Sequence, residues 1–245
     1  MPRKAPIQIN TLSVTFDLRI KPQQLYDFRG AMIALAGMDR DLFHNREITN
    51  GQWGKPMNRY PLIQYRVNEG RAAIWAMNEG IEALRSVMDR DGIPRFEMYG
   101  TETPLRIFEQ REQQGFAPKI SREQQLYRLR HYIPLNEDKY AAYTTAQNYN
   151  ERISLLEQLI LNELVLYTYA AQWPLGSKQK IKVRLYDILH QSDAKYRTKE
   201  DGGKDIEKHY KSYDLLFHTN ALLPEGIALG RHKSLGYGVM QLCTM

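Results

Sequence analysis

Residues 11–20 read TLSVTFDLRI, and apolar and polar side chains alternate along this whole stretch. Successive side chains of a strand point to opposite faces, so a period of two predicts a strand with one buried and one solvated face. Pro22 follows and suits the first turn of a helix, which we expect from about Gln23 to Met38. The chain therefore opens with a strand followed directly by a helix. The apolar face of this strand consists of Leu12, Val14, Phe16, Leu18 and Ile20.

The elements that follow predict a ferredoxin-like domain. A polar, irregular segment, 39–60, comes first, and long ordered loops of this kind are often functional. The order strand, helix, strand, strand, helix, strand is that of the ferredoxin-like fold. The elements expected after the loop are a hairpin of 62–67 and 72–77, a helix near Ile81, Leu84 and Met88, and strands at 95–99 and 105–109.

The same order of elements begins again in the second half of the chain. A polar stretch with Gly115 and Pro118, residues 111–121, is where we expect the linker. The sequence therefore predicts an α+β protein of two tandem ferredoxin-like domains, over 1–117 and 118–245. The elements expected in the second domain are strands at 126–133, 180–189, 209–218 and 236–243, and an amphipathic helix capped by Asn150.

Composition places the chain among ordinary globular proteins. Of its 245 residues, 42% are apolar and 25% are charged, which supports a packed core. Neither a run of about 18 apolar residues nor an apolar stretch after the basic start occurs, so we expect no membrane association and no secretory signal. The single cysteine, Cys243, allows neither an internal disulfide nor a cysteine zinc cluster. We therefore expect a cytoplasmic protein with Cys243 as a small buried residue.

The formal net charge of +6 favours a polyanionic partner, nucleic acid first and an anionic membrane second. Two expected strands carry cations on one face, and such a stripe can follow a phosphate backbone. A plain solvated strand face explains the same pattern equally well. The cations concerned are Lys180, Lys182 and Arg184 on one strand and Arg128 and Arg130 on the other.

The most specific feature lies near the end of the sequence, where residues 226–238 read GIALGRHKSLGYG. Glycines let the backbone adopt conformations closed to other residues and approach a ligand closely. Exposed N–H groups among cationic and hydroxyl side chains suit phosphate oxygens, although a basic hairpin without function also remains open. The candidate RNA-binding residues of this glycine loop are Gly230, Arg231, His232, Lys233, Ser234, Gly236 and Gly238.

Motifs of several other chemistries are missing from the sequence. No His-x-x-x-His pair and no Cys-x-x-Cys pair occurs, and there is no Gly-x-Ser-x-Gly elbow. The glycine spacing matches neither a Walker loop nor a dinucleotide fingerprint.

The glycine loop resembles the signature of the RAMP superfamily, in which two glycine-hydrophobic-glycine triplets flank five residues rich in Lys and Arg. The triplets here are 228–230 and 236–238, and Ala228 replaces the first glycine. Within the superfamily, residues 41–45 (DLFHN) and 60–66 (YPLIQYR) resemble the bacterial "b" subtype of the CRISPR repeat-processing endoribonucleases. The resemblance implies two RAMP-like (RRM-like) halves, the first with a catalytic loop and the second with the RNA-binding glycine loop.

The resemblance also implies a reaction that needs no metal and no cofactor. The ribose 2′-OH attacks the adjacent phosphate, which leaves a 2′,3′-cyclic phosphate and a 5′-OH. Because the family commonly keeps its catalytic histidine in the loop after the first helix, His44 is expected as general base or acid. Lys55 or Arg46 would stabilise the phosphorane. Members often have a second histidine nearby, where this chain has Asn45 and Arg46, so the second proton-transfer group stays open.

The remaining histidines have weaker claims to catalysis. His232, in the glycine loop, is the second candidate for proton transfer, with an RNA or solvent contact as its other interpretation. The four in or beside expected strands are expected to be structural or to contact RNA; they are His131, His190, His209 and His218.

Three functions remain open at this point. The first is the endoribonuclease, a monomer or homodimer whose partner is CRISPR repeat RNA and which could also meet other CRISPR effector subunits. The second is a non-catalytic RAMP subunit that binds guide RNA inside an effector complex, for which the glycine loop and basic strands serve equally well. The third is an unrelated basic αβ protein whose sheet mediates dimerisation, which predicts no strong affinity for RNA.

Overall fold

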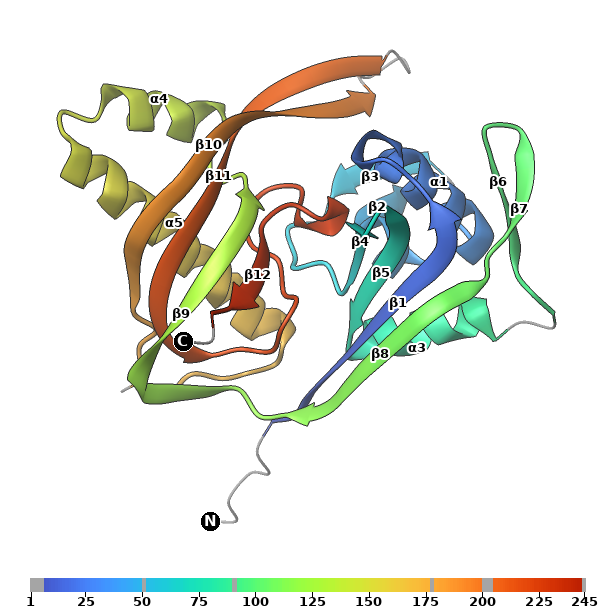
Figure 1. The fold of residues 1–245 in the computed structure, drawn as a ribbon, viewed down its shortest axis with the longest axis horizontal. Coiled ribbons are helices and arrows are strands. Elements are labelled where there is room, and N and C mark those ends of the chain that lie inside the picture. Colours follow the sequence, from blue (N-terminus) through green and yellow to red (C-terminus); the bar gives the residue numbers. More distant parts are fainter. Residues whose placement is uncertain (1–6, 50–51, 90–91, 177–178, 200–204, 244–245) are drawn as a thin grey trace. The chain divides into compact units, whose positions relative to one another are not determined.

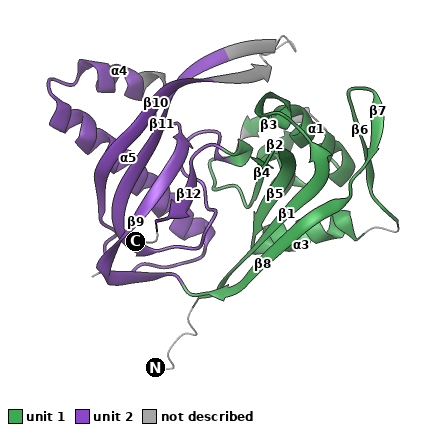
Figure 2. Ribbon diagram, viewed as in Figure 1, with its two compact units in different colours: residues 1–117, 234–236 green, residues 118–233, 237–245 purple. Residues whose placement is uncertain are grey.

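The computed structural model describes the chain except residues 1–6, 50–51, 90–91, 177–178, 200–204 and 244–245. Two compact units are present, as Figure 2 shows. The first contains residues 1–117 and 234–236, and the second contains 118–233 and 237–245. Each unit is built on an antiparallel four-stranded sheet (Figure 1).

The first unit has the predicted ferredoxin-like order. Its sheet runs β4-β5-β1-β8, which places the first strand between the third and the fourth of the fold. In the central strand, Val14 lies opposite both Ile74 and Gln110. The main elements are β1 (Ile9–Arg19), α1 (Leu25–Ala36), β4 (Ile63–Asn68), β5 (Arg71–Met77), α3 (Glu79–Met88) and β8 (Ile107–Phe116).

The alternating stretch that opened the sequence forms β1 and supplies the core of this unit. Val14 and Phe16 are 2% and 0% exposed. Helix α1 packs its Phe28 ring against Phe16 and Tyr65, with ring centroids 5.9 and 6.0 Å apart. Pro22 begins a short 3-10 turn, η1 (Pro22–Gln24), just before α1.

The composition of segment 39–60 predicted an irregular loop, but this segment contains regular secondary structure. Short elements occupy much of it, namely α2 (Asp41–His44), β2 (Arg46–Thr49) and β3 (Gln52–Pro56). Strands β2 and β3 pair with each other as a separate two-stranded ribbon. A second ribbon, formed by β6 (Arg95–Met98) and β7 (Thr101–Pro104), precedes β8.

The linker predicted at 111–121 is wrong in extent, because β8 continues to Phe116 and the next strand begins at Lys119. The stretch is polar because β8 is an edge strand of its sheet, and most of its side chains are exposed. An edge strand can be polar on both faces when backbone pairing to one neighbour holds it, as β1 does here. Its Glu112 also pairs with Arg85 of α3 at 2.7 Å.

The second unit repeats the strand order but not the second helix. Its sheet runs β10-β11-β9-β12, and α5 crosses one face of it (Figure 1). Between β11 and β12, residues 223–238 contain only the short 3-10 turn η2 (Lys233–Leu235). The glycine loop therefore stands where a ferredoxin-like fold has its second helix. The elements are β9 (Lys119–Tyr132), α4 (Glu137–Thr145), α5 (Tyr149–Ala170), β10 (Val183–Lys199), β11 (Asp205–Leu222) and β12 (Val239–Leu242).

The N-cap predicted for the long helix was two residues off. Asn148, not Asn150, caps α5, since its side-chain oxygen accepts from the backbone N–H of Glu151 at 3.0 Å. The carboxylate of Glu151 in turn accepts a hydrogen bond from the backbone N–H of Gln147 at 2.8 Å. An amide followed three residues later by glutamate is a strong start signal, and it outweighs the position of Asn150. Asn136 caps α4, which the sequence analysis did not predict, in the same way.

The class predicted from the sequence, α+β with two tandem ferredoxin-like halves, is confirmed by these two sheets. Strands β10 and β11 are longer than expected, while β12 is shorter. Cys243 lies just beyond β12 and is half-buried rather than buried. Within the described ranges, no helix has both the length and the apolar character of a membrane span.

Candidate functional site

His44 ends helix α2, and the turn after it fixes the position of its ring. Asn45 adopts a left-handed backbone conformation, with φ 53° and ψ 41°, which asparagine tolerates better than most residues. The chain reverses there and enters β2 at Arg46. The side chain of His44 is buried, with 1% of the residue exposed. The predicted catalytic histidine therefore lies beneath the surface of its loop.

Both ring nitrogens of His44 are hydrogen-bonded to the backbone. The N–H of Arg46 donates to Nδ1 at 3.1 Å, and Nε2 lies 3.0 Å from the carbonyl oxygen of Met38. Because an amide N–H only donates and a carbonyl only accepts, the ring is the neutral tautomer with its proton on Nε2. Burial lowers the pKa of His44; the hydrogen bond to Met38 opposes this, and the charge of Arg29 adds to it. His44 is therefore uncharged at neutral pH.

Asn45 ties helix α2 to the segment that precedes β4. Its side-chain oxygen accepts from Nε of Arg59 at 2.8 Å, and its amide nitrogen lies 3.4 Å from the carbonyl oxygen of Met57. Arg59 also pairs with Asp41, the first residue of α2, at 2.8 Å. These bonds close the turn on itself, so the position of His44 is set by several partners.

Arg46 and Lys55, the two cations predicted to act with His44, lie on the β2–β3 ribbon. Arg46 stands opposite Pro56, the residue that follows Lys55, across the ribbon. Both side chains are exposed, and neither forms an ion pair with a residue that the structure describes. The structure therefore gathers the three predicted catalytic residues within one short turn and ribbon, with the histidine inside and the cations outside.

A buried polar pair that the sequence analysis passed over lies close behind this segment. Gln64 of β4 donates from its amide to the hydroxyl of Tyr60 at 3.0 Å, and both residues are buried. Arg66, two residues further along the strand, donates to the side-chain oxygen of Gln64 at 2.7 Å. Alternation along the strand would place Gln64 and Arg66 on one face, which is the signal that could have identified them.

The glycine loop needs its glycines for steric reasons. Gly230, Gly236 and Gly238 have φ values of +89°, +76° and +67°. A Cβ atom on Gly238 would lie 1.8 Å from the carbonyl oxygen of Leu229, and one on Gly230 would lie 2.6 Å from the ring of Tyr132. The N–H of Leu229 donates to the carbonyl of Gly238 at 2.9 Å and closes the base of the loop. Close backbone approach, rather than flexibility, explains these glycines.

The cations of the glycine loop divide into one that faces outward and one that is held inside. Arg231 is exposed, and its guanidinium lies over the ring of Tyr210, 5.6 Å from the centroid. Lys233 donates to the carboxylate of Glu163 at 2.6 Å and to the carbonyl of Gly230 at 3.0 Å, with 13% of its side chain exposed. Lys233 therefore fastens the loop to α5.

The other polar residues of the loop are half-exposed. His232 has a left-handed backbone, with φ 55°, and its ring lies 5.1 Å from that of Tyr210 and 6.2 Å from that of Tyr237. Ser234 lies in the turn η2. Of the two histidines considered for proton transfer, His232 is the more accessible to solvent.

The basic strand faces are also divided between paired and exposed cations. Arg128 forms an ion pair with Asp214 at 2.9 Å, and Asp214 also accepts from the backbone N–H of His131 at 2.8 Å. Burial acts to raise the pKa of Asp214, but these hydrogen bonds outweigh it and the pKa is lowered. Arg130, two residues along β9, is exposed.

Lys180 and Lys182 do not lie in the strand that was predicted for them. They precede β10, and the side chain of Asn220 holds their backbone through bonds to Lys182 N at 2.7 Å and Lys180 O at 3.0 Å. Both lysines and Arg184, the second residue of β10, are exposed. The structural partners Asp214, Glu163 and Asn220 were missed because each is distant in sequence from the residue that it binds. In the part of the chain that the structure describes, no three His, Cys, Asp or Glu side chains form a group that could hold a metal ion.

Comparison with known families gives a match over nearly the whole chain. Residues 7–114 match the family model of the Cas6b N-terminal domain, and residues 119–243 match that of the Cas6b C-terminal domain. No curated protein matches the sequence.

Solved structures of similar fold cover both halves. A crystal structure of Cas6b matches with a TM-score of 0.73 at 14% identity, over 96% of this chain and 100% of that chain. A crystal structure of the CRISPR RNA processing endoribonuclease Cas6b gives a TM-score of 0.65 at 13% identity, over 96% and 100%. Csf5, a CRISPR-Cas type IV Cas6 crRNA endonuclease, gives 0.57 at 14% identity, over 97% and 100%. At such identities the likeness is one of fold.

Proposed function

The chain belongs to the Cas6b family of CRISPR RNA-processing endoribonucleases, and from that premise we propose that it cuts precursor RNA within CRISPR repeats without a metal ion. In this proposal the ribose 2′-OH attacks the adjacent phosphate. The P–O5′ bond breaks as the new P–O2′ bond forms, so the products carry a 2′,3′-cyclic phosphate and a 5′-OH.

The observation that carries the RNA-binding part of the proposal is the geometry of the glycine loop. Left-handed glycines at 230 and 238 allow a tight reversal that a Cβ atom would prevent. The reversal presents Arg231 to solvent above the ring of Tyr210. A guanidinium supported by an aromatic ring suits both phosphate and stacked bases. Exposed Arg130, Lys182 and Arg184 extend the positive charge of the same unit.

For the chemical step, we assign the exposed cations of the β2–β3 ribbon to the phosphate. Arg46 and Lys55 are exposed and unpaired within the described residues, so they are available to stabilise the charge of the phosphorane. His44 holds the start of this ribbon through the N–H of Arg46. A positioning role for His44 follows from this contact; direct proton transfer would require its ring to leave two backbone hydrogen bonds. His232 is the second candidate for the proton-transfer group.

One observation favours a second function, that of a non-catalytic subunit that binds guide RNA. The predicted catalytic histidine is buried and uncharged at neutral pH, and its hydrogen bonds are those of a structural residue. A protein of this kind would use the same glycine loop and the same exposed cations. The two functions differ only in whether the bound repeat is cut.

The test is cleavage of end-labelled repeat RNA from the source genome in EDTA. A repeat with a 2′-deoxy nucleotide before the cut site is the matched substrate control. The proposal expects one cut in EDTA and no cut in the deoxy repeat. It also expects a product with a terminal phosphate that phosphatase cannot remove until mild acid opens the cyclic phosphate. Tight binding of the uncut repeat would instead establish the binding subunit, and the absence of binding would contradict both.

A further inference from the structure

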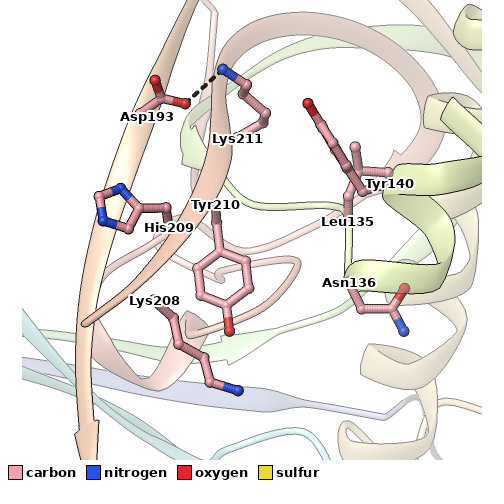
Figure 3. A pocket seen from close by; sticks show the side chains of 8 residues that line it. All are labelled: Leu135, Asn136, Tyr140, Asp193, Lys208, His209, Tyr210 and Lys211. Atoms are coloured by element: carbon pink, nitrogen blue, oxygen red, sulfur yellow. Dashed lines mark ion pairs between the residues drawn. The ribbon is translucent and has the colours of Figure 1, made fainter. Parts of the chain in front are cut away.

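A cavity in the second unit lies where β9 leaves the sheet. Strand β9 ends at Tyr132, opposite Tyr213, so the earlier part of β11 pairs with β10 alone. The chain then turns at Leu135 and Asn136 into helix α4, which stands over the vacated side of β11 (Figure 3). The space left between them has a volume of about 370 Å³, which is within the range of roughly 300–1,000 Å³ of small-ligand sites.

Two tyrosines from different elements line this cavity. Tyr210 comes from β11 and Tyr140 from α4, and Figure 3 shows both rings beside the space between the two elements. Tyr140 is 41% exposed although it lines a cavity. Aromatic rings in an open cavity form a surface on which a flat, apolar group can stack. The neighbouring Tyr143, by contrast, packs on Tyr213 with ring centroids 6.2 Å apart, so α4 is anchored without Tyr140.

Two lysines line the cavity. Lys208 is exposed at its rim, and Lys211 forms an ion pair with Asp193 at 2.7 Å. The hydrogen bond with Lys211 lowers the pKa of Asp193 and thus keeps its carboxylate ionised and neutralised by the lysine. Because both partners are partly exposed, this pair is weak, and an incoming phosphate can compete for Lys211. The cavity thus combines a stacking surface with cations at its mouth.

The glycine loop adjoins the same cavity through Tyr210. Arg231 and His232 contact the ring of Tyr210, at 5.6 Å from the guanidinium and 5.1 Å between ring centroids. A strand of RNA that follows Arg231 is therefore one side chain away from the cavity. Stacking surfaces joined to a cationic track are how proteins hold unpaired nucleotides.

We propose that this cavity binds one unpaired nucleotide of the repeat RNA, with its base stacked between Tyr140 and Tyr210 and its phosphate beside Lys208. The inference rests on the proposed function, because it takes the ligand to be part of the RNA that the glycine loop holds. A base stacks with either purine or pyrimidine rings, so the site selects for an unpaired position rather than for one base.

The experiment is a double-mutant cycle between protein and RNA. A set of repeat RNAs is used, each with a single abasic nucleotide at a different unpaired position. Each RNA is titrated with wild type and with Tyr140→Ala at fixed salt, and binding is followed by fluorescence anisotropy. Tyr140→Phe keeps the ring and is the conservative control. Tyr169→Ala removes a tyrosine of α5 that is 77% exposed and outside the cavity. Circular dichroism of each variant checks that the fold is kept.

The proposal expects Tyr140→Ala to weaken binding of the intact repeat by about 5- to 100-fold, the range given by base stacking on an aromatic ring. One abasic position should weaken wild-type binding by a similar factor and should weaken Tyr140→Ala clearly less, because only Tyr210 is then left to stack on the base. Tyr140→Phe and Tyr169→Ala should bind like wild type. Equal binding by Tyr140→Ala and wild type, or losses that multiply at every abasic position, would overturn the proposal.

Cleavage of the same intact repeat by wild type separates this inference from the proposed function. Cleavage without coupling to any abasic position rejects the nucleotide site and leaves the endoribonuclease. Coupling without cleavage supports the site and rejects the endoribonuclease. A wild-type protein that does not bind the repeat rejects both.

Discussion

Replacing His44 tests whether the buried histidine supports the ribbon or carries the proton. In His44→Ala the carbonyl of Met38 and the N–H of Arg46 lose their partners at 3.0 and 3.1 Å. Each buried group left unsatisfied costs about 1–3 kcal/mol, so the free energy of unfolding of the first unit should fall by about 2–6 kcal/mol. Urea denaturation, followed by tryptophan fluorescence, measures this loss.

Two amide substitutions separate the two bonds. In His44→Asn the side-chain oxygen takes the place of Nδ1 and accepts from Arg46, while in His44→Gln the amide nitrogen takes the place of Nε2 and donates to Met38. Each should therefore recover about half of the lost stability, about 1–3 kcal/mol. Neither amide can exchange a proton near neutral pH, so neither can act as general base or acid.

Cleavage of the repeat RNA by these variants decides the role. If His44 positions Arg46, cleavage by His44→Asn should exceed that by His44→Ala, since the bond to the Arg46 N–H is restored. Stable His44→Asn and His44→Gln proteins that bind RNA but cut no better than His44→Ala would refute the positioning argument and make His44 the proton-transfer residue.

Three further predictions follow from the same geometry. Because the pKa of His44 is lowered in the folded protein, the unfolded chain takes up its proton first as the pH falls through about 6.5. The free energy of unfolding should then decrease by at most about 1.4 kcal/mol per pH unit. The urea midpoints of wild type and His44→Asn should therefore diverge as the pH falls from about 7.5 to 5. Gly238→Ala places a Cβ 1.8 Å from the carbonyl oxygen of Leu229 and should lower the free energy of unfolding by at least about 3 kcal/mol. Gly100→Ala, with φ +72° but open space around it, should lower it by only about 1–2 kcal/mol. Thermal melts of both variants measure the difference. Arg231→Ala should lower RNA affinity and reduce the slope of log K against log salt by about 0.7–0.9, with stability unchanged. Lys233→Met should lower the free energy of unfolding by about 1–3 kcal/mol because it leaves the carboxylate of Glu163 without this partner. Equal salt slopes for the two variants would contradict the division of the loop cations.

The fold could be predicted from the sequence because local patterns, namely alternation in strands and spacing in helices, mark the elements of both halves. The alternation in residues 11–20 leaves one choice of buried face for the first strand, and the order of strands and helices along the chain indicated the ferredoxin-like sheet. The second part of the edge strand β8, from residue 111, was assigned to a linker because its polar side chains carry no alternation, although its backbone pairs with β1. The helix cap was misplaced by two residues because Asn150 and Asn148 are equally good caps until Glu151 is counted as the partner of Asn148.

The sequence predicted which residues could form the candidate site but not which hydrogen-bond and ion-pair partners they would have. The spacing of the glycines located the glycine loop, and the family resemblance pointed to His44; the structure places each in a turn with a left-handed residue. Whether a cation is free depends on acids far away in sequence, and Asp214 and Glu163 occupy Arg128 and Lys233 from distant strands and helices. Burial of His44 likewise depends on residues such as Met38 that no motif identifies.

Net charge therefore overstates the surface that can meet RNA, and the structure shows why. Lys233 lies within the RAMP-like signature itself, yet it fastens the loop to α5, and Arg128 lies on a basic strand, yet it neutralises Asp214. The exposed members of the same two features, Arg231 and Arg130, flank these fixed neighbours at two residues' distance. A motif rich in Lys and Arg thus needs some of its cations to hold the backbone in the conformation that offers the others. The same division applies in the first unit, where His44 is inside and Arg46 outside a single turn. In the second unit this division occurs in the glycine loop that takes the place of the second ferredoxin-like helix, where Lys233 is held inward and Arg231 is exposed.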